Sequence, residues 1–177
     1  MIFLYLGRLA KVKGIPLLLQ SLVEFHKTIP QAKLLIVGDG EEKVRIQEMC
    51  ISLGIEKSVI FCGLLAPEEV ALHVCAADVC VVASETEGFS NAMIEQIACG
   101  KPIVSTAVSG AKELICEGEN GYIVHSRDPK EYAQKMINAT HLFKAEEISR
   151  SIAVNNYSDK LLWETVQNQW PAIKISR

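Results

Sequence analysis

Short apolar runs of strand length alternate with helix-length segments from the start of the chain to Val124. The runs are apolar on both faces, which is typical of parallel strands covered by helices on both sides. Strand and helix in repeated alternation predict an open α/β sheet. The predicted strands span residues 2–7, 33–38, 58–63, 78–84, 102–106 and 121–124, and the predicted helices span 14–29, 41–54, 67–76, 90–99 and 110–117.

Beyond the last strand the pattern changes to helices only, predicted over 128–142, 144–155 and 158–170. Asp128 followed by Pro129 is a strong helix start, and Ser158 can cap the last helix. Trp163 and Trp170 share one face of that last helix, because seven residues make two helical turns. This face either packs on the same domain or docks on another one.

The length of 177 residues suits one domain, and we expect residues 1–177 to form a single Rossmann-like unit. Right-handed crossovers leave few arrangements of six such strands, and the commonest doubly wound order is 3-2-1-4-5-6. The predicted fold is therefore an α/β three-layer sandwich around a six-stranded parallel sheet, with additional C-terminal helices. An apolar content of 49% fits a well-buried core.

The composition also argues against several partners and locations. A net charge of -3 gives no reason to expect a nucleic-acid surface. No stretch approaches the roughly 18 apolar residues of a membrane-spanning helix, and the start "MIFLYLGRLAKVKG" reads as a strand and not as a signal peptide. The six cysteines lie mostly in apolar runs without C-x-x-C spacing, so we expect reduced core residues of a cytoplasmic protein.

The ligand crevice of such a sheet is predicted at the point where the strand order reverses, between strands 1 and 4. The loop after strand 1, "GRLAKVKG", carries Arg8, Lys11 and Lys13 between two glycines. The loop after strand 4, "ETEGFSN", leads into a helix that begins near Ser90 or Asn91 and points its positive end into the same space. Together these features predict a phosphate or diphosphate site.

Two glutamates, Glu87 and Glu95, lie in the same region. Carboxylates beside a phosphate would repel it, so we expect them to reach past it to hydroxyl groups. Glu95 is placed for vicinal hydroxyls such as a ribose diol, and Glu87 for hydroxyls on the other side of the phosphates. The predicted ligand is thus a nucleoside diphosphate bearing a sugar.

Competing motifs fit less well. A divalent metal held by Glu85, Glu87 and Glu95 is disfavoured by the basic residues opposite, so we expect no metal and no cofactor. The stretch "VGDGEEK" follows the second strand and has Lys43 where a dinucleotide-binding motif has its third glycine. The chain contains no P-loop motif.

At these residues the sequence resembles the donor-binding, C-terminal domain of GT-B fold glycosyltransferases, specifically the retaining group 1 or GT4 family. The resemblance covers nearly the whole chain. It is carried, in order, by "GRLAKVKG", "LLIVGDGEE", "VIFCGLL", "EGFSNAMIEQIACGKPIVST" and "VSGAKELICEGENGYIV".

The resemblance implies roles for individual positions. Arg8 and Lys13 would hold the donor diphosphate, Glu95 would bind the ribose hydroxyls, and Glu87 would contact the donor sugar. The implied catalytic residues are Arg8, Lys13 and Glu87. The implied nucleotide-sugar site comprises Gly7, Arg8, Lys13, Leu64, Glu87, Gly88, Phe89, Ser90, Asn91 and Glu95, with Leu64 and Leu65 near the base. Ser109, Gln96 and Ile97 depart from the family pattern.

The resemblance further implies a partner domain, because such enzymes carry an N-terminal Rossmann-like domain with the acceptor site. We therefore expect this sequence to be the C-terminal half of a GT-B enzyme. The donor would be UDP- or GDP-linked, and the acceptor a saccharide or a lipid-linked molecule in polysaccharide or glycolipid synthesis. The expected location is cytoplasmic, with peripheral association at the inner face of the membrane left open. A nucleotide-sugar 2-epimerase and a non-catalytic nucleotide-binding module are the alternatives.

Overall fold

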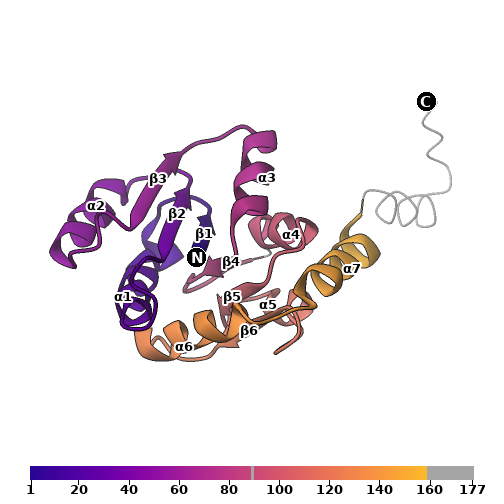
Figure 1. Ribbon diagram of the computed structural model, residues 1–177. Coiled ribbons are helices and arrows are strands. Elements are labelled where there is room, and N and C mark those ends of the chain that lie inside the picture. The colour runs from indigo at the N-terminus through magenta and orange to yellow at the C-terminus, as the bar shows by residue number, and fades with distance from the viewer. Residues whose placement is uncertain (89, 159–177) are drawn as a thin grey trace.

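The computed structural model describes residues 1–88 and 90–158. Its centre is a six-stranded, all-parallel sheet with the order β3-β2-β1-β4-β5-β6 (Figure 1). The predicted strand order is confirmed, and every predicted strand is present within two residues of its predicted ends. The strands are β1 (Ile2–Leu6), β2 (Lys33–Val37), β3 (Val59–Gly63), β4 (Val79–Val82), β5 (Ile103–Thr106) and β6 (Gly121–Val124).

Helices cover both faces of the sheet, which makes the predicted three-layer sandwich (Figure 1). Helices α1, α2 and α6 contribute buried apolar residues to the cluster on one face, and α3, α4, α5 and α7 contribute to the cluster on the other. The helices are α1 (Ile15–His26), α2 (Lys43–Ser52), α3 (Pro67–Ala76), α4 (Asn91–Ala98), α5 (Ala111–Leu114), α6 (Pro129–Ala139) and α7 (Ala145–Tyr157).

Strand β1 shows why the strands read as continuous apolar runs. Phe3 and Tyr5 enter the cluster under α1 and α6, while Leu4, between them, enters the opposite cluster. All three side chains are buried, because a strand in the middle of this sheet has a helix layer on each side. The ring of Phe3 packs edge-on against Phe25 of α1, with the centroids 4.8 Å apart.

Two helix ends show how far local signals predict the fold. The start of α6 follows the prediction, since the Asp128 side chain accepts a hydrogen bond from the Lys130 backbone N–H at 3.0 Å. Helix α5 ends earlier than the predicted 110–117. Buried Asn120 ends it, because its Oδ1 accepts from the Cys116 N–H and its Nδ2 donates to the Leu114 carbonyl.

The prediction that the cysteines are core residues is only partly correct. All six are free thiols, and Cys50 and Cys80 are buried, but Cys75 and Cys116 are exposed. Both exposed residues lie next to a helix end, where apolar runs reach the surface. Within residues 1–88 and 90–158, no helix combines the length and apolar character needed to cross a bilayer. The predicted helix over 158–170, including Trp163 and Trp170, lies outside the described residues from position 159 onward.

Candidate functional site

A cavity of about 180 Å³ opens where the loops after β1 and β4 meet. Strands β1 and β4 are neighbours in the sheet, so this is the predicted switch point of the strand order. Gly7 and Lys13 line the cavity from the first loop, Ser84 and Glu87 from the second, and Ser90 and Asn91 from the start of α4.

The first loop is anchored to the sheet on both sides. The Gly7 N–H donates to the Val37 carbonyl at 3.0 Å, which continues the β1–β2 ladder by one residue. After the 3-10 turn Lys11–Lys13, Gly14 takes φ 62°, and a Cβ there would lie 2.1 Å from the Ala83 carbonyl oxygen. Only glycine fits both requirements, and its close approach holds Lys13 near the end of β4.

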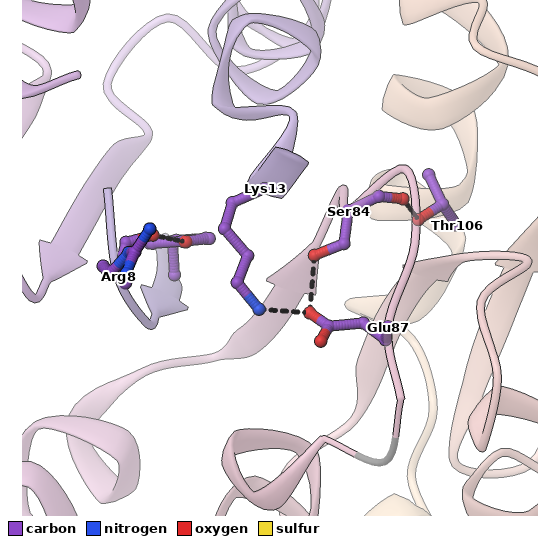
Figure 2. Close-up of polar contacts among 6 residues, drawn as sticks. Arg8, Lys13, Ser84, Glu87 and Thr106 are labelled. Carbon is purple, nitrogen blue, oxygen red and sulfur yellow. Dashed lines mark hydrogen bonds and ion pairs between the residues drawn. The ribbon is translucent and has the colours of Figure 1, made fainter. Parts of the chain in front are cut away.

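Lys13 and Glu87 meet directly across the cavity, as Figure 2 shows. Lys13 Nζ donates to Glu87 Oε1 at 2.6 Å, and the Ser84 hydroxyl donates to the same oxygen at 2.7 Å. The Lys13 and Glu87 side chains are 24% and 12% exposed, so the pair is largely shielded from solvent. The basic and acidic loops therefore face each other as the sequence predicts, and the opposite charges of Lys13 and Glu87 neutralise each other.

The helix end beside this pair presents backbone N–H donors to the cavity. Ser90 precedes α4 in an extended conformation, and its side chain makes no capping hydrogen bond. Among the residues that the structure describes, none accepts a hydrogen bond from the backbone N–H groups of Asn91 or Ala92. A Cβ added to Gly88 would meet no atom within 4 Å, so the space beside this residue is open. Backbone N–H groups at the start of a helix, beside a lysine, are suited to an anion.

Other predicted site residues lie outside this cavity. Arg8 is 71% exposed and pairs with Glu41 at 3.2 Å. Glu95 is exposed one turn into α4, and Leu64 is 81% exposed at the turn after β3. Phe89 is not among the described residues. The structure thus groups Gly7, Lys13, Glu87, Ser90 and Asn91 around one cavity. The roles assigned to these residues, and those assigned to Arg8, Leu64, Phe89 and Glu95, stay predictions.

Three polar residues of the site escape the sequence-based prediction. The Thr106 hydroxyl donates to the Ser84 carbonyl at 2.7 Å, and the Tyr5 hydroxyl donates to the Arg8 carbonyl at 2.8 Å. Burial, together with the charge of Glu87, raises the pKa of Tyr5 above its usual range, so its phenol stays protonated as a donor. A signal for Ser84 and Thr106 does exist, because each is a polar residue at the end of an otherwise apolar run.

A separate cavity of about 160 Å³ takes the remaining lysine of the first loop. Lys11 lines it together with Arg45 and Arg127. Two carboxylates partly neutralise these cations, since Arg45 pairs with Glu42 at 3.0 Å and Arg127 approaches Glu85 to 4.0 Å. Lys11 and Lys13 therefore line different cavities, although they are two positions apart. Within the described part of the chain, no group of three or more His, Cys, Asp or Glu residues is arranged to hold a metal ion.

Comparison with known proteins agrees with this architecture. The family model for group 1 glycosyl transferases matches residues 1–154. The N-acetyl-alpha-D-glucosaminyl L-malate synthase of Bacillus anthracis is 32% identical over 151 residues, which is 85% of this chain and 38% of that protein. A D-inositol 3-phosphate glycosyltransferase of Acidothermus cellulolyticus is also 32% identical, over 75% of this chain and 32% of its own length. The chain thus spans about a third of these relatives.

Solved structures share the fold over nearly the whole chain. The pneumococcal O-GlcNAc transferase GtfA, solved in complex with UDP and GlcNAc, superposes with a TM-score of 0.86 at 25% identity. This match covers 97% of this chain and 35% of GtfA. The C-terminal domain of the Francisella tularensis group 1 protein LpcC has the same fold, with a TM-score of 0.77 at 24% identity and coverage of 89% of this chain and 86% of that domain. The protein therefore belongs to the group 1 glycosyltransferase family, with the GT-B type of fold.

Proposed function

We propose that this chain is the donor-binding half of a retaining, GT4-type glycosyltransferase, and that its ligand is a UDP- or GDP-linked sugar. The observation that carries the proposal is the cavity at the switch point. There the Lys13 ammonium, the Glu87 carboxylate and the backbone N–H groups of Asn91 and Ala92 lie around one space, and these N–H groups have no acceptor among the described residues. Three donors suit a diphosphate, and the carboxylate suits the hydroxyl groups of the attached sugar.

The cavity is smaller than a site that encloses a whole nucleotide sugar. Its volume of about 180 Å³ is below the roughly 300–1,000 Å³ of pockets that enclose drug-sized ligands. We assign it to the diphosphate and the adjoining sugar. The nucleoside would extend along the same edge of the sheet toward exposed Glu95 and Leu64, which we assign to the ribose and the base.

Catalysis in this proposal is stabilisation of the leaving group. When the bond between the sugar and the diphosphate breaks, negative charge gathers on the departing phosphate while the sugar becomes oxocarbenium-like. Lys13 and the positive end of α4 stabilise that charge, and they are held in place before the reaction begins. Arg8 would join them by leaving Glu41, a rearrangement that costs little because this ion pair is exposed. We expect no metal requirement.

The acceptor site belongs to the partner domain in this proposal. The relatives named above are longer than this chain, and two domains that close on each other would supply orientation and exclude water. We propose a saccharide or lipid-linked acceptor and a cytoplasmic location, at the inner face of the membrane where the acceptor is a lipid. The free state of all six cysteines is in keeping with a reducing compartment.

Calorimetric titration of the chain with UDP, GDP and ADP, each with and without an attached glucose or mannose, tests this function. We expect one nucleoside diphosphate to bind without added divalent cations and an attached sugar to add affinity. Binding that requires a divalent cation, or the absence of binding by every nucleotide, would refute the proposal. A second assay, with the partner domain present, measures transfer of the sugar to water or to an acceptor. Such transfer distinguishes a transferase from a non-catalytic binding module. Release of a sugar epimerised at C2 would instead indicate the epimerase.

A further inference from the structure

Ser84 joins β4 to the acidic loop, and its backbone is held from two sides. The Thr106 hydroxyl, at the end of β5, donates to the Ser84 carbonyl at 2.7 Å. The next peptide is tied to the first loop, because the Glu85 N–H donates to the Val12 carbonyl at 2.8 Å. Ser84 itself is buried, so its side chain has little freedom to rotate.

The Ser84 hydroxyl is directed at one oxygen of Glu87. It donates to Oε1 at 2.7 Å, and Lys13 Nζ donates to this same oxygen at 2.6 Å. Figure 2 shows both contacts ending on that atom. No residue in the described ranges donates a hydrogen bond to Oε2 of Glu87. One carboxylate oxygen is thus used within the protein, and the other has no donor among the described residues and can accept from a ligand.

The two donors on Oε1 differ in what a ligand does to them. A diphosphate in the cavity attracts the Lys13 ammonium, which lies at the end of a flexible side chain. The Ser84 hydroxyl is neutral, buried and fixed by the sheet, so a diphosphate leaves it where it is. It is therefore the donor that still holds the carboxylate once Lys13 has turned to the ligand.

We propose that Ser84 is a positioning residue that holds Glu87 through Oε1, so that Oε2 is presented to a hydroxyl group of the bound sugar. Thr106 supports it by fixing the Ser84 backbone. This inference rests on the proposed function, because it concerns the sugar of a nucleotide sugar. It goes further in assigning a role to Ser84 and Thr106, two residues that act through Glu87.

The test measures how much affinity the sugar adds to the bare nucleoside diphosphate. It compares the affinity for UDP-glucose with the affinity for UDP, or the affinity for GDP-mannose with the affinity for GDP. The pair that the wild-type chain binds better is used. Ser84→Ala should lower the extra affinity contributed by the sugar by about tenfold, the size of one hydrogen bond to a charged group. Affinity for the bare diphosphate should change less than about twofold, because Lys13 and the N-terminus of α4 are untouched. Thr106→Val, which removes the hydroxyl at nearly constant volume, should act in the same direction, and Thr106→Ser should restore the wild-type ratio.

Ser105→Ala is the matched control. Its hydroxyl is also buried and donates to a backbone carbonyl, that of Thr106 at 2.8 Å, but within the described part of the chain it makes no hydrogen bond to Glu87. We expect it to leave the ratio of the two affinities unchanged. In a Glu87→Ala background, Ser84→Ala should have less than about a twofold further effect, because the group that it positions is gone.

Each outcome has a distinct meaning. An unchanged ratio in Ser84→Ala, or equal weakening of the bare and the sugar-bearing nucleotide, would overturn the inference while leaving the proposed function intact. The same loss in Ser105→Ala would show a general packing effect and would also overturn it. A wild-type chain that gains no affinity from the sugar would refute the proposed sugar site, and the inference with it.

Discussion

Replacement of Lys13 by methionine is the most direct test of the anion site. Methionine keeps an unbranched, largely apolar side chain as far as the position of Cε and lacks the ammonium. The Lys13 side chain is 24% exposed and makes a 2.6 Å contact with a carboxylate, so it is already positioned and partly desolvated. A hydrogen bond from such a group to a phosphate contributes roughly 1.5–3 kcal/mol, so the affinity for a nucleoside diphosphate should fall by about 10- to 150-fold.

Loss of Lys13 has a second effect that also weakens binding. Glu87 is 12% exposed and would keep only the Ser84 hydroxyl as a partner. Its charge would then face the incoming phosphates without neutralisation. Adding Glu87→Gln to Lys13→Met should therefore recover part of the lost affinity for the bare diphosphate. By the same reasoning, Glu87→Gln alone should leave the affinity for the bare diphosphate equal to or above the wild-type value. The attached sugar should add less affinity in this variant than it adds in the wild type.

Lys11→Met is the matched control, because Lys11 has the same charge and lies on the same loop but lines the other cavity. Isothermal titration at 25 °C in low salt should show a change of less than about threefold for this variant. Arg8→Ala should fall between the two lysine variants, since Arg8 must first leave Glu41. Equal losses for Lys11→Met and Lys13→Met, or no loss for Lys13→Met, would refute the assignment of the phosphates to this cavity.

Four further outcomes are expected. Tyr132→Phe should lower the free energy of unfolding by roughly 2–4 kcal/mol in denaturant titration, because the buried Tyr132 hydroxyl donates to the Val104 carbonyl and accepts from the Val82 N–H. The Tyr122 hydroxyl has no such bonds among the described residues, so Tyr122→Phe should lower the free energy of unfolding by less than about 0.5 kcal/mol. Gln96→Met should raise the free energy of unfolding by about 1–3 kcal/mol, since neither polar atom of buried Gln96 has a hydrogen-bond partner among the described residues, and an unchanged melting temperature would contradict this. Glu95→Gln should weaken the bare diphosphate by roughly 1.5–3 kcal/mol yet barely affect a 2′,3′-dideoxy analogue, and equal losses for both nucleotides would exclude the ribose as its partner. This chain alone should transfer no sugar in a product assay by mass spectrometry, and turnover by a verified monomer would disprove the need for a partner domain.

The sequence by itself determined the strands, their order and the place of the crevice. The strands follow from the length and apolar character of each run, which are local properties of the sequence. Their order follows from the right-handed crossover rule, which allows only a few arrangements of the strands in a sheet. Because adjacent parallel strands end at the same edge, the loops that carry Lys13 and Glu87 had to meet. Their contact at 2.6 Å agrees with that reasoning.

Only the tertiary structure decided which side chains pair. Arg8 and Lys13 look alike in sequence, yet one lies on the surface with Glu41 and the other inside the cavity with Glu87. Thr106 reaches the Ser84 carbonyl from a different strand, and Asn120 ends α5 from six residues beyond Leu114. Such pairings depend on the register between strands and on side-chain rotamers. Both are set by packing across the whole fold, and a local pattern of residues does not contain them.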